Sequence, residues 1–237
     1  MARDGIGGVG LAASPVERGS LHLQVYRKLC EVISTGELQP GAEVTLASLA
    51  ELVGTSAMPV RDAVRRLIGE RALELRPGRR FGVPRLSADQ YREILRIRLL
   101  LEAEAARVAA ERIADDELAG IKRVQEELAH SDRAGGTRRE LWTLNRQFHF
   151  GIYEAARLPQ LCSMIAGLWL QMGPLFNHLA VDIGTRRAAG YHEMILSGLE
   201  RRDGEAAAEA MRNDLLSAAE QILEQLSESG SATRKIA

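Results

Sequence analysis

From Leu46 to Val83 the chain reads LASLAELVGTSAMPVRDAVRRLIGERALELRPGRRFGV, and this stretch decides its fold. The first eight residues place apolar side chains at the i, i+3, i+4 and i+7 positions of a short amphipathic helix. Gly54 ends that helix, and Thr55 or Ser56 can cap the next one. Pro59 falls in the first turn of this second helix, where its missing N–H costs little. The stretch predicts a helix-turn-helix followed by a basic hairpin, or wing, a geometry that places a helix in the major groove of DNA.

The second helix has an apolar arc and a basic arc. At ~100° per residue, the apolar arc collects the residues that should pack on the preceding helices, namely Val60, Ala63, Val64 and Leu67. Arg61 and Arg65 lie beside Met58 on an adjacent arc and are expected to face outward. An arginine fork can clamp a guanine edge or neutralise a phosphate. Arg66 points to the other flank and is expected to contact the DNA backbone.

The hairpin adds further positive charge. Gly78 and Gly82 permit a tight turn, with Arg79 and Arg80 at its tip. Residues 61–85 carry eight arginines against three acidic residues, a net charge of +5. The expected DNA-binding set is therefore Ser56, Met58, Arg61, Arg65, Arg66, Arg79 and Arg80. The alternative is a solvated basic face on an ordinary helical domain, which explains single arginines but not the whole arrangement.

Residues 21–84 resemble the winged-helix domain of the GntR superfamily of bacterial transcription regulators. The resemblance is carried by Val25-Tyr26, Ile33, Gly36–Gly41, Leu49-Ala50, Pro59–Ala63 and Arg66-Leu67. It implies that this domain binds a double-stranded DNA operator. In that family an arginine often follows the serine that opens the recognition helix, and here that position is Ala57. A contact that relatives make there is therefore missing from this chain.

Size and charge favour two domains of opposite charge. The chain has 237 residues, of which 46% are hydrophobic and only 4% aromatic, as is typical of helices packed on helices. Residues 1–86 carry a net charge of +3 and the remainder −4, as expected for a DNA-binding head on a sensing or dimerising body. The expected divisions are a disordered leader over 1–19, a winged helix-turn-helix over 20–85, a helical domain over 86–228 and a flexible tail over 229–237.

Cysteine content and hydropathy indicate a cytoplasmic protein. Cys30 and Cys162 are too few for a disulfide framework and are expected to be reduced thiols. No stretch reaches the ~18 apolar residues needed to span a bilayer, and the N-terminus lacks the apolar segment of a signal peptide. The sequence therefore predicts no membrane partner.

The second domain is predicted to be an all-α bundle. Ser87 and Gln90 form a capping box at the start of a long helix that reaches about residue 114. Further helices are expected over 115–130, 138–156, 159–181, 186–200 and 203–226, without any strand-type alternation. The fold class is therefore mainly α, with an N-terminal winged helix-turn-helix and a C-terminal helical bundle.

Three of these helices carry side chains suited to a divalent metal. Asn145 and His149 are spaced i, i+4 and share one helix face. His192 lies near the start of the fifth helix, and Asp214 lies midway along the sixth. Imidazole nitrogens with hard oxygens suit Zn, Ni or Mn. Taken singly, each residue is more often an ordinary core or surface residue.

Residues 87–227 resemble the FCD ligand-sensing domain of the FadR subfamily. Arg98–Glu102 resembles the family's Arg-x-x-Leu-Glu pattern, Asn145–His149 its Asp/Asn-x-x-Phe-His metal motif, and His192 its next ligand. Asp214 stands where relatives carry a third histidine, so a metal should be held more weakly here.

The same resemblance implies that the bundle binds a small organic acid. Arg98 is the expected anchor for the carboxylate of this effector, and His178 is a candidate for the pocket wall. Two alternatives remain open. One is a metal-free pocket in which the same groups hydrogen-bond the effector, and the other is a structural ion pair of Arg98 with Glu102 or Glu104.

These features together predict a ligand-responsive transcription regulator, expected to be a repressor. It should bind a pseudo-palindromic operator as a homodimer, because one module reads only a half-site. The carboxylate effector would alter the spacing or mobility of the two winged helices and so change operator affinity. One rival is a helical metalloenzyme that acts on a small carboxylate through His149, His192 and Asp214. Another is an adaptor that uses the winged helix for protein contacts. Neither rival explains the outward arginines.

Overall fold

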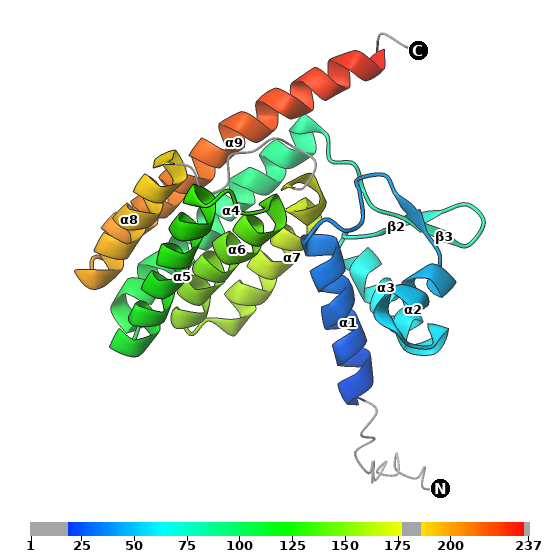
Figure 1. Ribbon diagram of the computed structural model, residues 1–237, viewed down its shortest axis with the longest axis horizontal. Coiled ribbons are helices and arrows are strands. Elements are labelled where there is room, and N and C mark those ends of the chain that lie inside the picture. The colour runs from blue at the N-terminus through cyan, green and yellow to red at the C-terminus, as the bar shows by residue number, and fades with distance from the viewer. Residues whose placement is uncertain (1–18, 177–185, 235–237) are drawn as a thin grey trace, which may run out of the picture.

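The computed structural model describes residues 19–176 and 186–234, so nearly all of the expected leader and residue His178 lie outside the described part. Figure 1 shows a small domain that contains the strands and a larger bundle of helices beside it. Helix α1 (Gly19–Ser34) contacts α2 (Leu46–Val53) and α3 (Ala57–Gly69) of the small domain and also α7 (Pro159–Phe176) of the bundle. It therefore forms part of the junction between the two domains.

The small domain is a winged helix-turn-helix, as the sequence predicts. Helices α2 (Leu46–Val53) and α3 (Ala57–Gly69) follow α1. The strands β1 (Glu43–Val44), β2 (Glu74–Arg76) and β3 (Arg80–Gly82) form an antiparallel sheet in the order β1-β3-β2. In this register Phe81 lies opposite Val44 on one side and Leu75 on the other. Strand β3 is therefore paired along both edges, which fixes the wing on the domain.

The turn between α2 and α3 follows from local chemistry. Thr45 and Ser48 form a capping box at the start of α2. Gly54 ends the helix with φ of 69°, a left-handed conformation that costs glycine little. Ser56 occupies the N-cap position of α3, but its hydroxyl makes no capping hydrogen bond, contrary to expectation. The exposed hydroxyl of Ser56 is therefore not used by the helix.

The large domain is an all-α bundle. Its described helices are α4 (Ala88–Arg112), α5 (Asp115–Arg133), α6 (Arg138–Ala155), α7 (Pro159–Phe176), α8 (Arg186–Glu200) and α9 (Gly204–Arg234). Helix α9 packs along α4 and α8, and α5 packs on α6 (Figure 1). Ser87 and Gln90 form the expected capping box of α4, and Asp203 caps α9 by accepting from the N–H of Ala206 at 3.0 Å. None of the described helices combines the length and the apolar character needed to cross a membrane.

Helix α9 differs from its predicted extent. It continues to Arg234, beyond the end expected near Leu226, so most residues expected in the flexible tail belong to this helix. The other described helices begin within a few residues of their expected positions.

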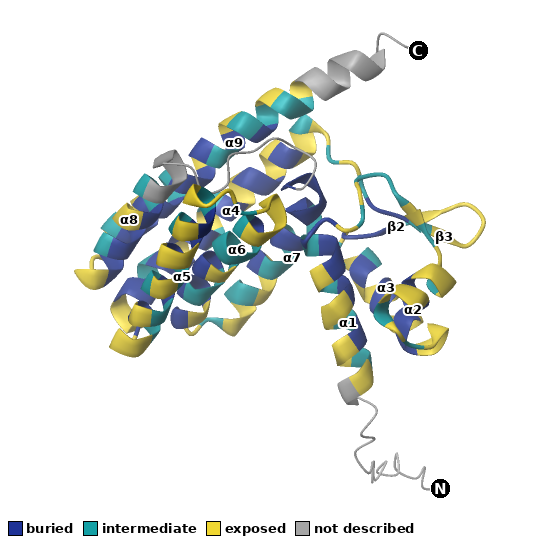
Figure 2. Cartoon of the chain, in the orientation of Figure 1, coloured by how far each residue is buried: buried dark blue, intermediate teal, exposed yellow. Residues whose placement is uncertain are grey.

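The two domains have separate hydrophobic cores that meet at α7. Figure 2 shows the buried residues gathered between the elements of each domain, with exposed residues on the outside. Leu170 of α7 belongs to the core of the small domain, whereas its neighbour Trp169 belongs to the core of the bundle. Gly173 lies so close to α1 that an added Cβ would stand 2.5 Å from the Cα of Ser34. Close packing of α7 on α1 therefore joins the domains.

Candidate functional site

The exposed face of α3 is basic. Val60, Ala63, Val64 and Leu67 are buried in the core of the small domain, as predicted. Arg61 and Arg65 are exposed, and Met58 is 70% exposed. The guanidinium of Arg65 is 3.8 Å from Asp62 Oδ1, a long and solvent-exposed ion pair. This face of α3 therefore presents two guanidinium groups and one thioether to solvent.

Arg66 lies apart from this face. Its Nε donates to Glu70 Oε1 at 2.8 Å, and its guanidinium lies 3.7 Å from the centre of the Tyr26 ring. Tyr26 in turn donates to Glu70 Oε2 at 2.6 Å. Arg66 therefore ties α3 to α1 while its side chain stays 53% exposed, and its contact with the DNA backbone remains a prediction. Successive residues of a helix are rotated by about 100° around its axis, and this rotation directs Arg66 away from Arg65 and toward α1.

The wing presents one arginine at its tip and one on its strand. Gly78 and Arg79 have φ values of 76° and 59°, two consecutive left-handed residues that make the turn tight. Arg79 is exposed at this turn. Arg80 is also exposed but donates to Glu43 of the neighbouring strand β1 at 2.8 Å. Arg79 is therefore the more available cation, and Arg80 also braces the sheet.

A buried polar cluster lies inside the bundle. The ligand-type atoms of His149 (α6), His192 (α8) and Asp214 (α9) all lie within 4.8 Å of one another. His149 Nε2 is 3.4 Å from Asp214 Oδ2, and His192 Nε2 is 3.6 Å from Asp214 Oδ1. All three side chains are buried. The structure thus brings together three of the predicted ligands from three different helices.

Neighbouring side chains orient both imidazole rings. His192 Nδ1 lies 2.6 Å from Gln125 Oε1, so this nitrogen donates its hydrogen to the amide oxygen. His149 Nδ1 lies 3.1 Å from the hydroxyl of Tyr153, which donates its own hydrogen to a carboxylate and so accepts from His149. Each ring is left with a lone pair on the Nε2 atom that faces Asp214, and His192 Nε2 has no hydrogen-bond partner among the described residues. Two lone pairs that face a carboxylate repel it unless a cation or a proton lies between them.

Burial shifts the pKa of each group in the cluster toward its neutral form. It raises the pKa of Asp214 to about 7 and lowers the pKa of His192 to about 3. Burial, followed by the charges of His192 and Arg98, also holds the pKa of His149 well below its usual value. Near neutral pH both imidazoles are therefore unprotonated, which is the form that ligates metals. Two neutral imidazole nitrogens and a carboxylate fit a divalent metal and leave positions for other ligands.

Asn145 and His178 are the other two residues predicted to line this site. Asn145 is half-buried one helical turn before His149, so it lies on the same side of α6, as the spacing predicts. His178 lies outside the described residues. Among the described residues, His149, His192 and Asp214 therefore form the centre of this site.

Arg98 is buried near the cluster, and its main partner is Glu102. The two distances of this pair are 2.6 Å from Nε to Oε1 and 3.3 Å from Nη2 to Oε2. Nη1 faces the sulfur of Met172 at 3.7 Å, and the guanidinium is 5.1 Å from the centre of the Trp169 ring. The structural ion pair that the sequence left open is therefore present. A carboxylate ligand of Arg98 would meet the Nη1 edge, whose acceptor is weak, and would share the arginine with Glu102.

Sequence reasoning named Glu102 only as a possible partner of Arg98 and missed the other residues that hold the predicted ones in place. Glu102 accepts hydrogen bonds from Arg98, from Tyr153 and from Trp169, the last at 3.0 Å. Gln125 of α5 orients His192. The i, i+4 spacing of His149 and Tyr153 is the one local signal, and it is shared by many pairs in any helix. Gln125 and Trp169 come from other helices, so their roles depend on tertiary packing.

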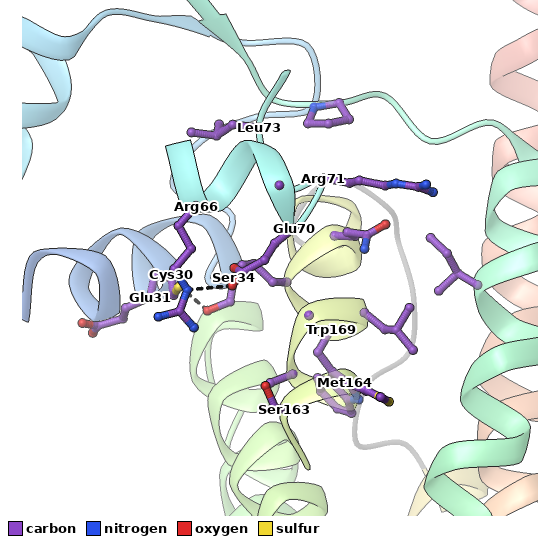
Figure 3. Close-up of a pocket in the computed structure, with 18 of the residues that line it drawn as sticks. Cys30, Glu31, Ser34, Arg66, Glu70, Arg71, Leu73, Ser163, Met164 and Trp169 are labelled. Atoms are coloured by element: carbon purple, nitrogen blue, oxygen red, sulfur yellow. Dashed lines mark hydrogen bonds and ion pairs between the residues drawn. The ribbon is translucent and has the colours of Figure 1, made fainter. Parts of the chain in front are cut away.

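A separate pocket lies between the two domains (Figure 3). It has a volume of ≈ 1570 Å³ and is lined by α1, α4, α6, α7 and the end of α3. Ser34 and Arg66 reach it from the small domain, and Met164 and Trp169 reach it from α7. Trp169 therefore lies between this interdomain pocket and the buried carboxylate of Glu102.

Comparison with known families accounts for both domains. Residues 21–83 match the family described as bacterial regulatory proteins, gntR family. Residues 93–217 match the FCD domain. The two matched regions meet near the start of α4, which is where the two hydrophobic cores divide.

Individual relatives extend the similarity over both domains. The HTH-type transcriptional regulator McbR of Escherichia coli is 35% identical over 204 residues, which cover 83% of this chain and 91% of the relative. A probable D-xylose utilization operon transcriptional repressor of Paenarthrobacter nicotinovorans is 31% identical over 196 residues, with coverages of 82% and 85%. The solved structure titled E. coli McbR/YncC has a TM-score of 0.78 at 32% identity and covers 88% of this chain and 98% of its own.

Proposed function

This chain belongs to the GntR family of bacterial regulatory proteins and carries an FCD domain, and on that premise we propose a repressor whose operator affinity is controlled by a small organic acid. It is a transcription regulator and not an enzyme, because its relatives and structural neighbours are transcription regulators. The helical metalloenzyme considered from the sequence is thereby excluded. One chain combines an exposed basic recognition helix with a buried polar cluster, and this combination carries the proposal.

Helix α3 and the wing are the proposed DNA-reading elements. Arg61 and Arg65 stand on the exposed face of α3, with Ser56 and Met58 at its N-terminal end. We assign base contacts to this face, because recognition helices present their N-terminal residues to base edges. Arg79 at the tip of the wing is assigned to the phosphate backbone, with Arg80 beside it.

The proposed effector site is the buried cluster together with Arg98. The Nη1 edge of Arg98 would bind the effector carboxylate, because its present acceptor is a sulfur atom. A divalent metal would be held by His149, His192 and Asp214 and would supply a Lewis-acid position for an effector oxygen. Asn145 lies close enough along α6 to add a fourth donor. Gln125 and Tyr153 support this site because they keep both Nε2 atoms turned inward.

The regulator is proposed to act as a homodimer on a pseudo-palindromic operator. Exposed apolar side chains on α4 support an interface through the bundle, since Leu100 and Ile97 are three residues apart and 73% and 39% exposed. The relative from Paenarthrobacter nicotinovorans, which is named a probable transcriptional repressor, supports repression.

Fluorescence anisotropy of labelled duplex DNA tests this proposal. The probe is the region upstream of the gene for this chain, and a scrambled duplex of equal composition is the control. The full chain should prefer the upstream duplex, and its affinity should fall steeply with salt because phosphate contacts release counterions. Equal affinity for the scrambled duplex at every salt concentration would refute sequence-specific DNA binding.

Organic acids that raise the melting temperature of the protein should also release the DNA. Acids that stabilise the protein without changing DNA affinity would refute effector control.

A further inference from the structure

On the basis of the function proposed above, we propose that the stacked indoles of Trp142 and Trp169 position the DNA-binding domain on the bundle and couple that position to the buried Glu102. Both tryptophans act as positioning residues, since neither belongs to the proposed ligand set. They are the only two tryptophans of the chain. The coupling joins the end of α1 to the effector site through a hydrogen bond or a ring contact at every step.

The first step is the place where α1 rests on the bundle. Trp142 Nε1 donates to the carbonyl oxygen of Ser34, the last residue of α1, at 2.7 Å. Gly173 of α7 lies against the same residue, where an added Cβ would be 2.5 Å from the Ser34 Cα. Arg139 of α6 also pairs with Glu37 just beyond α1 at 2.6 Å. Figure 3 shows Ser34 facing the interdomain pocket that Trp169 also lines.

The second step is the aromatic stack. The Trp142 ring stacks on the Trp169 ring with a centroid distance of 5.0 Å and on Phe176 at 3.8 Å. Both indoles are 2% exposed, so they belong to the close-packed core. The two rings are in direct stacking contact, so a displacement of one changes the packing of the other. A shift of the Trp169 ring therefore displaces the Trp142 ring as well.

The third step is Glu102, at which the stack meets the effector site. Trp169 Nε1 donates to Glu102 Oε1 at 3.0 Å, and Arg98 pairs with both oxygens of the same carboxylate. Tyr153 also donates to Glu102 and accepts from His149. Both halves of the proposed site, the guanidinium of Arg98 and the ring of His149, thus reach Trp169 through one carboxylate.

Binding of an effector changes how the negative charge of Glu102 is compensated. An effector that engages Arg98 takes part of the positive charge that compensates Glu102. A buried carboxylate with a weakened cationic partner depends more on its remaining donors, and Trp169 is one of them. The indole then shifts with the carboxylate, Trp142 follows, and the support of α1 changes. Because α3 packs on α1, the orientation of the recognition helix changes with it.

Hydrogen exchange over residues 31–37 of the full chain tests this coupling without any ligand. Trp142→Phe keeps an aromatic ring but removes the N–H that bonds Ser34, and Trp169→Phe removes the N–H that bonds Glu102. Each should speed exchange in this segment on the order of tenfold, the scale of typical coupling between sites. The double variant should exchange no faster than Trp142→Phe, because both changes interrupt one route. Ile152→Val, which removes one methylene from the same helix and leaves both indoles, is the matched control and should behave as wild type.

The outcomes separate this coupling from the function on which it rests. Wild-type exchange in Trp169→Phe, or purely additive effects in the double variant, overturns the coupling. In a second measurement, Zn²⁺ alone should change exchange over residues 31–37 in the wild type but not in Trp169→Phe, although dialysis should show equal Zn²⁺ content in both. An equal response of both proteins overturns the coupling, since a merely structural role of Trp169 would leave it intact. If neither protein binds Zn²⁺, the metal part of the proposed function fails, and the ligand-free measurement still decides the coupling.

Discussion

Arg98 and Glu102 form a bidentate ion pair inside the bundle, with nitrogen to oxygen distances of 2.6 and 3.3 Å. The two residues lie one turn apart on α4, and their side chains are 4% and 0% exposed. The proposed anchor of the effector is thus held in position by a neighbour on its own helix. An effector carboxylate therefore competes with Glu102, and this competition connects ligand binding with the rest of the bundle.

Removal of Arg98 should destabilise the protein strongly. Arg98→Ala leaves Glu102 buried without its cationic partner, which costs about 3–5 kcal/mol. The double variant Arg98→Met/Glu102→Gln should recover part of this loss, because it removes both charges and leaves a side-chain oxygen that can still accept from Trp169 or Tyr153. Denaturant unfolding of the full chain measures both effects. Arg92→Ala, which removes an exposed arginine of the same helix, is the control, and an equally small loss in Arg98→Ala would show that the buried pair contributes little.

Arg61→Ala should weaken operator binding. Loss of one bidentate base contact costs about 1–3 kcal/mol, which corresponds to about 5- to 150-fold in affinity. Anisotropy titrations at fixed salt measure this loss, and Arg92→Ala serves as the control because Arg92 is an exposed arginine of the bundle helix α4. Unchanged affinity in Arg61→Ala would remove this residue from the recognition face.

The two histidines of the cluster should be required for metal. The variant His149→Ala/His192→Ala removes both imidazole nitrogens that approach Asp214. Elemental analysis after dialysis against Zn²⁺, Ni²⁺ or Mn²⁺ should therefore find no bound metal in this variant and one equivalent in the wild type. His130→Ala is the matched control, since His130 is exposed on α5. Metal retained by the double variant would place the ion elsewhere.

Gln125→Ala should weaken metal binding although Gln125 is not a proposed ligand. The amide oxygen of Gln125 accepts from His192 Nδ1 at 2.6 Å and so directs Nε2 toward Asp214. Loss of such an orienting hydrogen bond reduces metal affinity about 10- to 100-fold. A competition titration with a chromophoric chelator measures the change. The same affinity in Gln125→Ala and wild type would show that packing alone orients the ring.

Metal affinity should depend on pH through Asp214. Burial raises the pKa of this carboxyl to about 7, so below that pH a metal must displace its proton. The affinity should therefore rise about tenfold per pH unit up to about pH 7 and level off above it. The histidines add no proton release near pH 6, because burial lowers the pKa of His192 to about 3 and that of His149 well below its usual value. Chelator competition at a series of pH values checks this slope, and Asp214→Asn should bind more weakly with no slope.

The same pKa shifts act in opposite directions on the stability of the metal-free protein. Asp214, whose folded pKa is raised, favours folding at acid pH and loses that contribution as pH rises toward 7. His192, whose folded pKa is lowered, disfavours folding at acid pH, and this cost disappears as pH rises through the usual range of histidine.

The DNA-binding head was predictable because its determinants are local. The spacing of apolar residues, the stop at Gly54 and the position of Pro59 act within one or two helical turns, and the structure has α2 and α3 where they were expected. The contacts of Arg66 could be predicted only in part from local spacing. Its contact with Glu70 is an i, i+4 pair, but its contact with Tyr26 could not be derived from periodicity, since Tyr26 comes from another helix.

The candidate pocket was predictable only in part. His149, His192 and Asp214 were chosen as metal-suited side chains on predicted helices and then compared with the family's metal motif, and the structure brings them within 4.8 Å of one another. Spacing along the chain carries no information about this meeting, because each residue lies on a different helix. The orienting partner Gln125 was missed for the same reason.

By itself, the amino-acid sequence determined the helices, the wing and the division into a basic head and an acidic body, since these depend on neighbours within a few residues. Tertiary structure alone decided that Trp169 donates to Glu102 and that Trp142 supports Ser34. The physical reason is that a buried donor or acceptor must find its partner among whichever side chains the packed helices bring within about 3 Å, and those side chains are distant in the chain.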